Sequence, residues 1–203
     1  MLAARLQDHD DTPTEDRIVV LRGMQWADYQ RMLEVRGERS SPRFAYLDGE
    51  LEIMTPSRSH ASIKSRIGTL VEVWCLERAI EFSPYGSWTL ANVPAERGLE
   101  PDECYVFGNV PEPARPDLAI EVVWTSGGVS KLAIYASLDL PEVWIWRRGR
   151  ISVHLLENSA YTEATTSRAL PRIDLVQLAS YLDRPTASQA IREYRAALSA
   201  KAP

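Results

Sequence analysis

Two acidic side chains share one face of a short apolar segment near the middle of the chain, residues 116–123. In an extended conformation the alternating apolar side chains form one face, and Asp117 and Glu121 lie on the other. Unpaired buried charge is very costly, so a partner must compensate these carboxylates. An arginine, water or a metal ion could be that partner.

A second acidic segment precedes it at residues 100–107, and a lysine, Lys131, follows on a predicted helix. Acids on two neighbouring strands with a nearby lysine suit a divalent-metal site for phosphodiester chemistry, because Mg²⁺ is typically held by one or two carboxylates. The ion polarises the phosphate and lowers the pKa of an attacking water. Asp102 and Glu121 are therefore candidate metal ligands, and Lys131 could orient the water or stabilise developing charge. The competing interpretation is that both acids pair with arginines and that Lys131 is solvated.

Other polar side chains are candidates for accessory roles. His60 and Lys64 lie four residues apart, so both could line one cleft from a helix face, although a capping or surface histidine fits nearly as well. Asp117 is either a further ligand or a residue hydrogen-bonded to its own loop. Arg147 and Arg148 belong to the densest basic cluster, which could bind a phosphate backbone or simply be a solvated hairpin turn.

Composition favours one globular domain. The chain has 203 residues, a net charge of -5 and two cysteines without metal-type spacing. The acidic balance argues against a non-specific nucleic-acid coat, because phosphate binding depends on clustered Lys and Arg. It does not exclude a nuclease. We expect a flexible tail over residues 1–16 and a single domain over residues 17–203. With no membrane span or signal peptide apparent, a cytoplasmic protein is expected.

Periodicity predicts a mixed α/β (or α+β) fold. The clearest signal is a hairpin over residues 44–54 with Asp48-Gly49 as its two-residue turn. Further strands are expected at residues 18–21, 100–107, 116–123, 142–146, 151–156 and 161–165, and a strand followed by a turn at 82–90. Helices are expected over 26–37, 59–80, 131–138, 175–182 and 186–198. Residues 92–98 are expected to be a loop.

The ordered set of motifs resembles the Uma-two family of restriction endonuclease-like proteins, within the PD-(D/E)xK nuclease superfamily. The motifs that carry the resemblance lie at residues 46–51, 54–60, 101–105, 116–122, 131–135 and 140–144. The resemblance implies a central mixed β-sheet flanked by helices. It also implies a Mg²⁺- or Mn²⁺-dependent site that hydrolyses DNA.

Carried over residue by residue, the resemblance makes Asp102 the motif aspartate and Glu121 the second acid. The superfamily's usual lysine position holds Val123 here, and the family is thought to move the lysine onto the following helix, where Lys131 stands. Ala45 is a second departure, since many members carry a glutamate there. Glu50 nearby could supply the missing oxygen.

Three functions remain open from the sequence. The first is a metal-dependent endonuclease that cuts DNA. Ala45 and Val123 favour a second, a catalytically inactive DNA- or protein-binding module with a nuclease fold. The third is a carboxylate-pair hydrolase acting on sugars, which would need no metal. A homo-oligomer, most simply a dimer, is expected to gather basic residues around the acids through residues 142–146 and 59–80.

Overall fold

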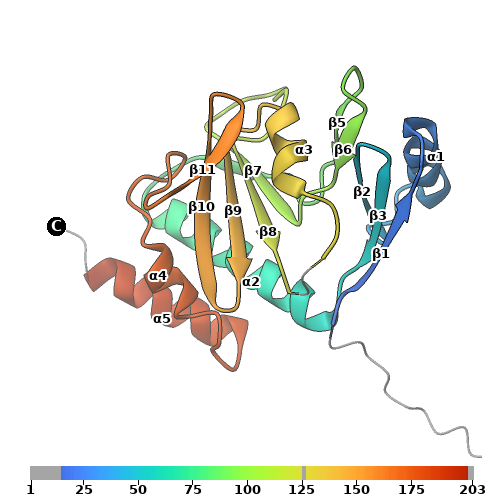
Figure 1. Cartoon of the computed structure of the whole chain (residues 1–203). Coiled ribbons are helices and arrows are strands. Elements are labelled where there is room, and N and C mark those ends of the chain that lie inside the picture. Colours follow the sequence, from blue (N-terminus) through green and yellow to red (C-terminus); the bar gives the residue numbers. More distant parts are fainter. Residues whose placement is uncertain (1–14, 125–126, 201–203) are drawn as a thin grey trace, which may run out of the picture.

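The computed structural model describes residues 15–124 and 127–200. In these ranges eleven strands form a five-stranded and a six-stranded sheet, with five helices around them (Figure 1). The strands are β1 (Arg17–Arg22), β2 (Arg43–Leu47), β3 (Glu50–Thr55), β4 (Phe82–Pro84), β5 (Leu90–Asn92), β6 (Arg97–Leu99), β7 (Glu103–Phe107), β8 (Leu118–Val122), β9 (Glu142–Arg147), β10 (Arg150–Glu157) and β11 (Ala160–Ala164). The helices are α1 (Trp26–Arg36), α2 (Arg58–Glu77), α3 (Lys131–Ser137), α4 (Leu175–Ala179) and α5 (Ala187–Ala200).

The six-stranded sheet has the order β11-β10-β9-β8-β7-β4. Its β8–β9 pair is parallel and its other pairs are antiparallel, which confirms the predicted mixed sheet. A parallel pair needs a crossover connection, and α3 lies in the segment that supplies it. All five residues of β8 are buried, so this strand is the centre of the molecule.

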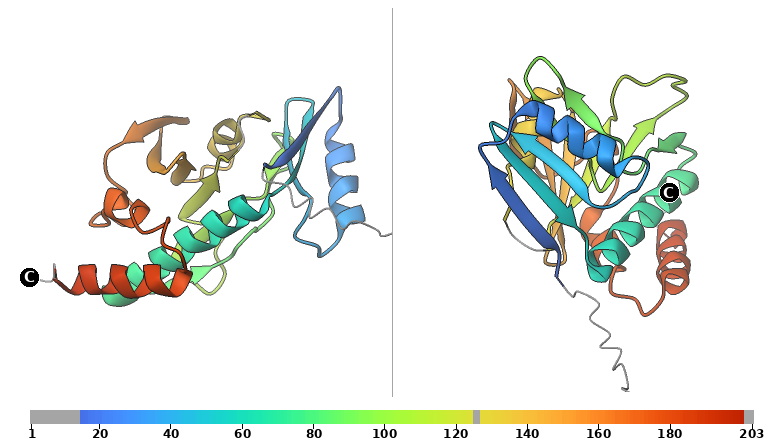
Figure 2. Two further views of the ribbon diagram at one scale, coloured as in Figure 1. Left: turned by 90° about the horizontal axis from the view of Figure 1, so that it is seen from below. Right: turned by 90° about the vertical axis from the view of Figure 1, so that its right-hand side faces the viewer.

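Helices cover both faces of this sheet. The helices α2 and α5 run side by side across one face (Figure 1, Figure 2), where their apolar side chains pack on Leu118, Ile120 and Val122 of β8. Helix α3 lies on the opposite face, where Ala119 joins a second apolar cluster with Ile134 of that helix. The alternation read from the sequence is therefore correct, and it turns Glu121 toward α3.

The predicted hairpin over residues 44–54 forms, and it becomes part of a separate sheet with the order β1-β3-β2-β6-β5. Asp48 and Gly49 both have positive φ, 48° and 86°, as a two-residue hairpin turn requires. Helix α1 packs on the outer face of this sheet (Figure 2) through Trp26 and Tyr29. The mixed sheet flanked by helices was predicted, whereas the second sheet goes beyond that prediction.

Several boundaries follow from local chemistry. The Ser57 hydroxyl caps α2 by accepting a hydrogen bond from the His60 backbone N–H, and Gly37 ends α1 as expected. The short strands β5 and β6 replace part of the expected loop. Residues 1–14 lie outside the described part of the chain, and Asp16 is buried at 8% exposure, so it does not belong to the expected flexible tail.

One of the two elements expected to form a dimer contact is covered. Residues 142–146 belong to β9, which is hydrogen-bonded to β8 on one side and β10 on the other. Trp144 and Trp146 of this strand are buried in the core. Helix α2 packs between the sheet and α5. The expectation that residues 142–146 form the subunit contact is therefore wrong. Helix α2 keeps exposed residues such as Leu76, at 68% exposure, so its part of the expectation stays a prediction. Among the described residues, no helix combines the length and apolar character needed to cross a membrane.

Candidate active site

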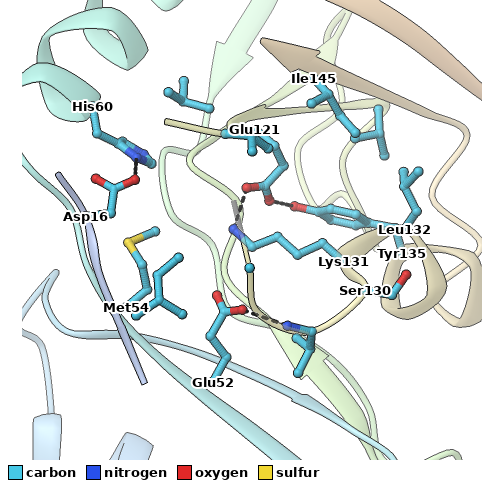
Figure 3. A pocket seen from close by; sticks show the side chains of 16 residues that line it. Asp16, Glu52, Met54, His60, Glu121, Ser130, Lys131, Leu132, Tyr135 and Ile145 are labelled. Carbon is cyan, nitrogen blue, oxygen red and sulfur yellow. Dashed lines mark hydrogen bonds and ion pairs between the residues drawn. The ribbon is translucent and has the colours of Figure 1, made fainter. Parts of the chain in front are cut away.

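A pocket of about 180 Å³ lies where β3 of the smaller sheet faces β8 and α3 (Figure 3). Charged side chains from both sheets and both adjoining helices line it: Asp16, Glu52, His60, Glu121 and Lys131. The rest of the wall is largely apolar, so charges inside the pocket interact more strongly than they would in water.

Glu121 and Lys131 form the centre of this pocket. Lys131 Nζ lies 2.6 Å from Glu121 Oε2, and the Tyr135 hydroxyl donates a hydrogen bond to the other carboxylate oxygen. Burial raises the pKa of Glu121 even though Lys131 opposes the shift. Burial alone would lower the pKa of Lys131, but the charges of Glu121, Asp102 and Glu52 raise it, so the ammonium keeps its proton.

Helix α3 positions both partners of Glu121. Lys131 is the first residue of the helix, and Tyr135 lies one turn further along the same face. Ten residues separate Lys131 from Glu121 in sequence, and the crossover brings the helix back over the end of β8. The structure thus places Lys131 in the same pocket as Glu121.

Asp102 lies beside Glu121 but is fully buried. The β7–β8 register pairs Glu103 with Ile120, and the same register continued by one residue sets Asp102 opposite Glu121. Asp102 Oδ1 accepts hydrogen bonds from Arg43 and from His60 Nε2, and Oδ2 accepts one from the Val122 N–H at 2.6 Å. Burial alone would raise the pKa of Asp102, but the His60 hydrogen bond and nearby positive charges hold it well below its usual range.

His60 bridges two acids. Its Nε2 lies 2.9 Å from Asp102 Oδ1, and its Nδ1 lies 2.9 Å from Asp16 Oδ2. Burial alone would lower the pKa of His60, but the hydrogen bonds to Asp102 and Asp16 raise it to about 9. The sequence singled out His60 through its spacing to Lys64, whereas its actual partners lie far away in the chain.

The pKa of His60 predicts a pH-dependent stability. In the folded protein this pKa is about 9, against an ordinary value of 6.5. The stabilisation from the charged imidazole is therefore full below pH 6.5 and is lost as the pH rises through about 9. A shift of this size corresponds to on the order of 3 kcal/mol at most. We expect urea unfolding to show a falling free energy over this range in the wild type and a flatter profile in His60→Gln. Equal slopes in both proteins would contradict the prediction.

Glu52 is a pocket residue that the sequence analysis missed. It is buried at 4% exposure, and its Oε2 accepts a hydrogen bond from the Val129 N–H at 2.9 Å. The hairpin register sets it directly opposite Ala45. A usable signal existed, because a two-residue Asp48-Gly49 turn fixes this register and so places residues 45 and 52 on one face.

Two other candidate acids lie outside the pocket. Glu50 forms an ion pair with Arg22 at 2.9 Å, with 40% of the glutamate side chain exposed. Asp117 accepts a hydrogen bond from the Phe107 N–H at 2.8 Å, which ties the start of β8 to the end of β7. The structure does not bring either carboxylate to Glu121.

The candidate basic residues occupy two places, Lys64 on α2 and the Arg147–Arg148 pair at the β9–β10 turn. Lys64 Nζ is 3.4 Å from Glu103. Arg147 and Arg148 are exposed where β9 turns into β10. Because β8 and β9 are parallel, this turn lies at the same end of the sheet as Glu121, which pairs with Ile145.

The family of the chain is decided by a match to a family model. The model Uma2, described as "Putative restriction endonuclease", matches residues 26–184. The chain belongs to the Uma2 family. A search of curated proteins finds no match. Among solved structures, this chain is similar to one described as a putative nuclease belonging to DUF820 from Anabaena variabilis. The two share 12% sequence identity and superpose with a TM-score of 0.48, and the match covers 80% of this chain and 96% of that chain.

The oxygen donors of this Uma2 chain suit a hard divalent cation. Within the described ranges, no group of three or more His, Cys, Asp or Glu side chains is arranged to hold a metal ion. Mg²⁺ needs fewer protein ligands, because one or two carboxylates and several waters commonly hold it. Glu121 lines the pocket and Asp102 lies next to it, so their carboxylates fit such an ion in chemical type.

Proposed function

We propose that this Uma2 protein is a divalent-metal-dependent endonuclease that hydrolyses phosphodiester bonds in DNA. The observation that carries the proposal is the Glu121–Lys131 pair at 2.6 Å, in a pocket at the end of the central strand and beside Asp102. A buried acid held against a lysine offers a cation site and a phosphate-binding charge at one place.

Each residue has a defined role in this proposal. Glu121 and Asp102 would hold Mg²⁺ or Mn²⁺, which when bound supplies Lewis-acid activation of the phosphate and of water. Lys131 keeps its proton, so it would donate hydrogen bonds to the attacking water or to a phosphate oxygen. Tyr135 fixes the orientation of Glu121 through its hydrogen bond.

Arg147 and Arg148 are the candidate contacts to the DNA backbone, because they are exposed at the same end of the sheet as Glu121. Lys64 is a weaker candidate, since Glu103 already neutralises it. The net charge of -5 gives one chain a weak attraction for DNA, so we also propose a homodimer that brings basic residues of two chains together. Light scattering, which measures the molar mass in solution, tests whether the protein is a dimer.

The alternative is a nuclease-fold module that binds DNA or protein without cutting. Asp102 favours it, because Arg43, His60 and the Val122 N–H already occupy both of its oxygens. A buried acid in such a network can serve stability alone.

Cleavage of supercoiled plasmid separates these functions. For a metal-dependent nuclease we expect nicked and linear products with Mg²⁺ or Mn²⁺ and none after addition of EDTA. Duplex binding without cleavage under any of these ions would overturn the proposal in favour of the binding module. Hydrolysis of a sugar substrate that EDTA leaves unchanged would instead indicate the carboxylate-pair hydrolase.

A further inference from the structure

The two acids that flank Lys131 in the pocket come from different sheets. Glu52 is on β3 of the smaller sheet, and Glu121 is on β8 of the six-stranded sheet. The Lys131 side chain extends between them (Figure 3). Against the effect of burial, the negative charges of both carboxylates raise the pKa of Lys131. One ammonium thus faces two carboxylates, which leaves a local excess of negative charge.

Glu52 has unused capacity to bind a cation. Its Oε2 accepts one hydrogen bond, from the Val129 N–H, and its Oε1 has no hydrogen-bond partner in the described part of the chain. The side chain is buried at 4% exposure yet lines the pocket. Oε1 is not among the buried side-chain atoms that lack a partner in the described ranges, so it is accessible from the pocket and can coordinate a cation.

The backbone near Glu52 is shaped around its carboxylate. Gly128 has a φ of +89°, and a Cβ atom at this position would lie 1.9 Å from Glu52 Oε2. Another residue would be strained at this positive φ, and its Cβ would displace the Glu52 carboxylate, so glycine suits the loop before α3. On the facing strand, the residue opposite Glu52 is the small Ala45.

We infer that Glu52 is a further ligand for the divalent ion, so that Glu52 of the smaller sheet would hold it together with Glu121 and the adjoining Asp102. The inference rests on the proposed nuclease function and adds a residue to its site. Asp102 has hydrogen bonds from Arg43 and His60 on one oxygen and from a backbone N–H on the other, whereas Glu52 has an oxygen to spare.

Mn²⁺ binding to the DNA-free protein tests this role without an activity measurement. Isothermal titration calorimetry should show Mn²⁺ affinity at least about ten-fold weaker in Glu52→Gln than in the wild type. Urea unfolding without metal should be little changed, because a glutamine oxygen can still accept from the Val129 N–H. A residue that only anchors this loop would leave the Mn²⁺ affinity unchanged.

Exchanging the two facing residues gives a second test. Residues directly opposite in an antiparallel pair have Cβ atoms about 5 Å apart on the same face. The double variant Ala45→Glu, Glu52→Ala keeps the composition and returns a carboxylate to this wall of the pocket. We expect it to bind Mn²⁺ more tightly than Glu52→Ala alone, and equally weak binding by both would count against the inference.

Two single variants separate the inference from the function on which it rests. Glu50→Gln changes a glutamate of the same strand that pairs with Arg22, and Glu193→Gln changes one on α5 that pairs with Arg184. Both should bind Mn²⁺ like the wild type, and a loss with Glu50→Gln but not with Glu52→Gln would overturn the inference. Wild-type affinity in Glu52→Gln with a loss in Glu121→Gln would reject the Glu52 role while supporting the proposed function. No Mn²⁺ binding by an inactive wild type would reject both.

Discussion

Replacing Glu121 by glutamine should lower kcat/KM for DNA cleavage by about 10²–10³-fold, the range expected for loss of one charge-stabilising group in an active site. Glutamine keeps the length of the side chain, and its single amide oxygen can replace one of the two oxygens that accept hydrogen bonds from Lys131 and Tyr135. It removes the negative charge that a divalent ion needs. Steady-state cleavage of a labelled duplex at saturating Mg²⁺ measures the effect.

A matched control for Glu121→Gln is Glu142→Gln, on the neighbouring strand β9. Glu142 is also buried, at 1% exposure, but its carboxylate accepts hydrogen bonds from Trp144 Nε1 and from the Arg168 and Ala169 N–H groups. We expect this control to lose stability and to keep its cleavage rate wherever it is folded. Equal losses of activity in both variants, each folded by circular dichroism, would contradict the assigned role of Glu121.

Replacing Arg43 by methionine should lower the free energy of unfolding by about 3 kcal/mol, because it removes a positive partner from a fully buried carboxylate. Arg43 donates a hydrogen bond to Asp102, which is 0% exposed. His60 and the Val122 N–H still support Asp102, so the loss should fall at the lower end of the usual range for broken buried pairs. Urea unfolding of the wild type and the variant at neutral pH measures it.

A double-mutant cycle isolates the Arg43–Asp102 interaction. The combined variant Arg43→Met, Asp102→Asn should lose clearly less stability than the sum of the two single changes. Arg195→Met breaks an ion pair with Glu77 in which 62% of the arginine side chain is exposed, so it should cost less than about 1 kcal/mol. Additive losses for Arg43 and Asp102 would show that their contact contributes little.

The sequence predicted those parts of the molecule whose signals are local. The alternation in residues 118–122 correctly turned Glu121 away from the main apolar core, and the Asp48-Gly49 turn correctly defined a hairpin. Helical spacing also located α2 and α3. Acids on two adjoining strands with a nearby lysine already pointed to Asp102, Glu121 and Lys131, and the family motifs strengthened that set.

The missed features depend on contacts between distant segments. Asp102 receives its hydrogen bonds from Arg43 and His60, which are 59 and 42 positions away, and no local pattern signals such partners. Glu52, and not the expected Glu50, lies opposite Ala45, because the two-residue turn sets the register of the hairpin. The strands β5 and β6 have three residues each, too few to produce a periodic signal.

The division of the protein into two sheets affects how precisely the charged residues of the pocket are held relative to one another. Glu52 and Glu121 belong to sheets that share no backbone ladder within the described ranges, so their separation depends on the side chains packed between them. Ala45 and Leu99 of the smaller sheet meet Ala119 and Val143 of the larger one in that cluster. A displacement of about 1 Å can reduce catalysis 10²-fold. Conservative substitutions among the apolar side chains between the two sheets would therefore change or abolish activity while the charged residues stay the same. Relatives with identical acidic residues would then differ widely in activity.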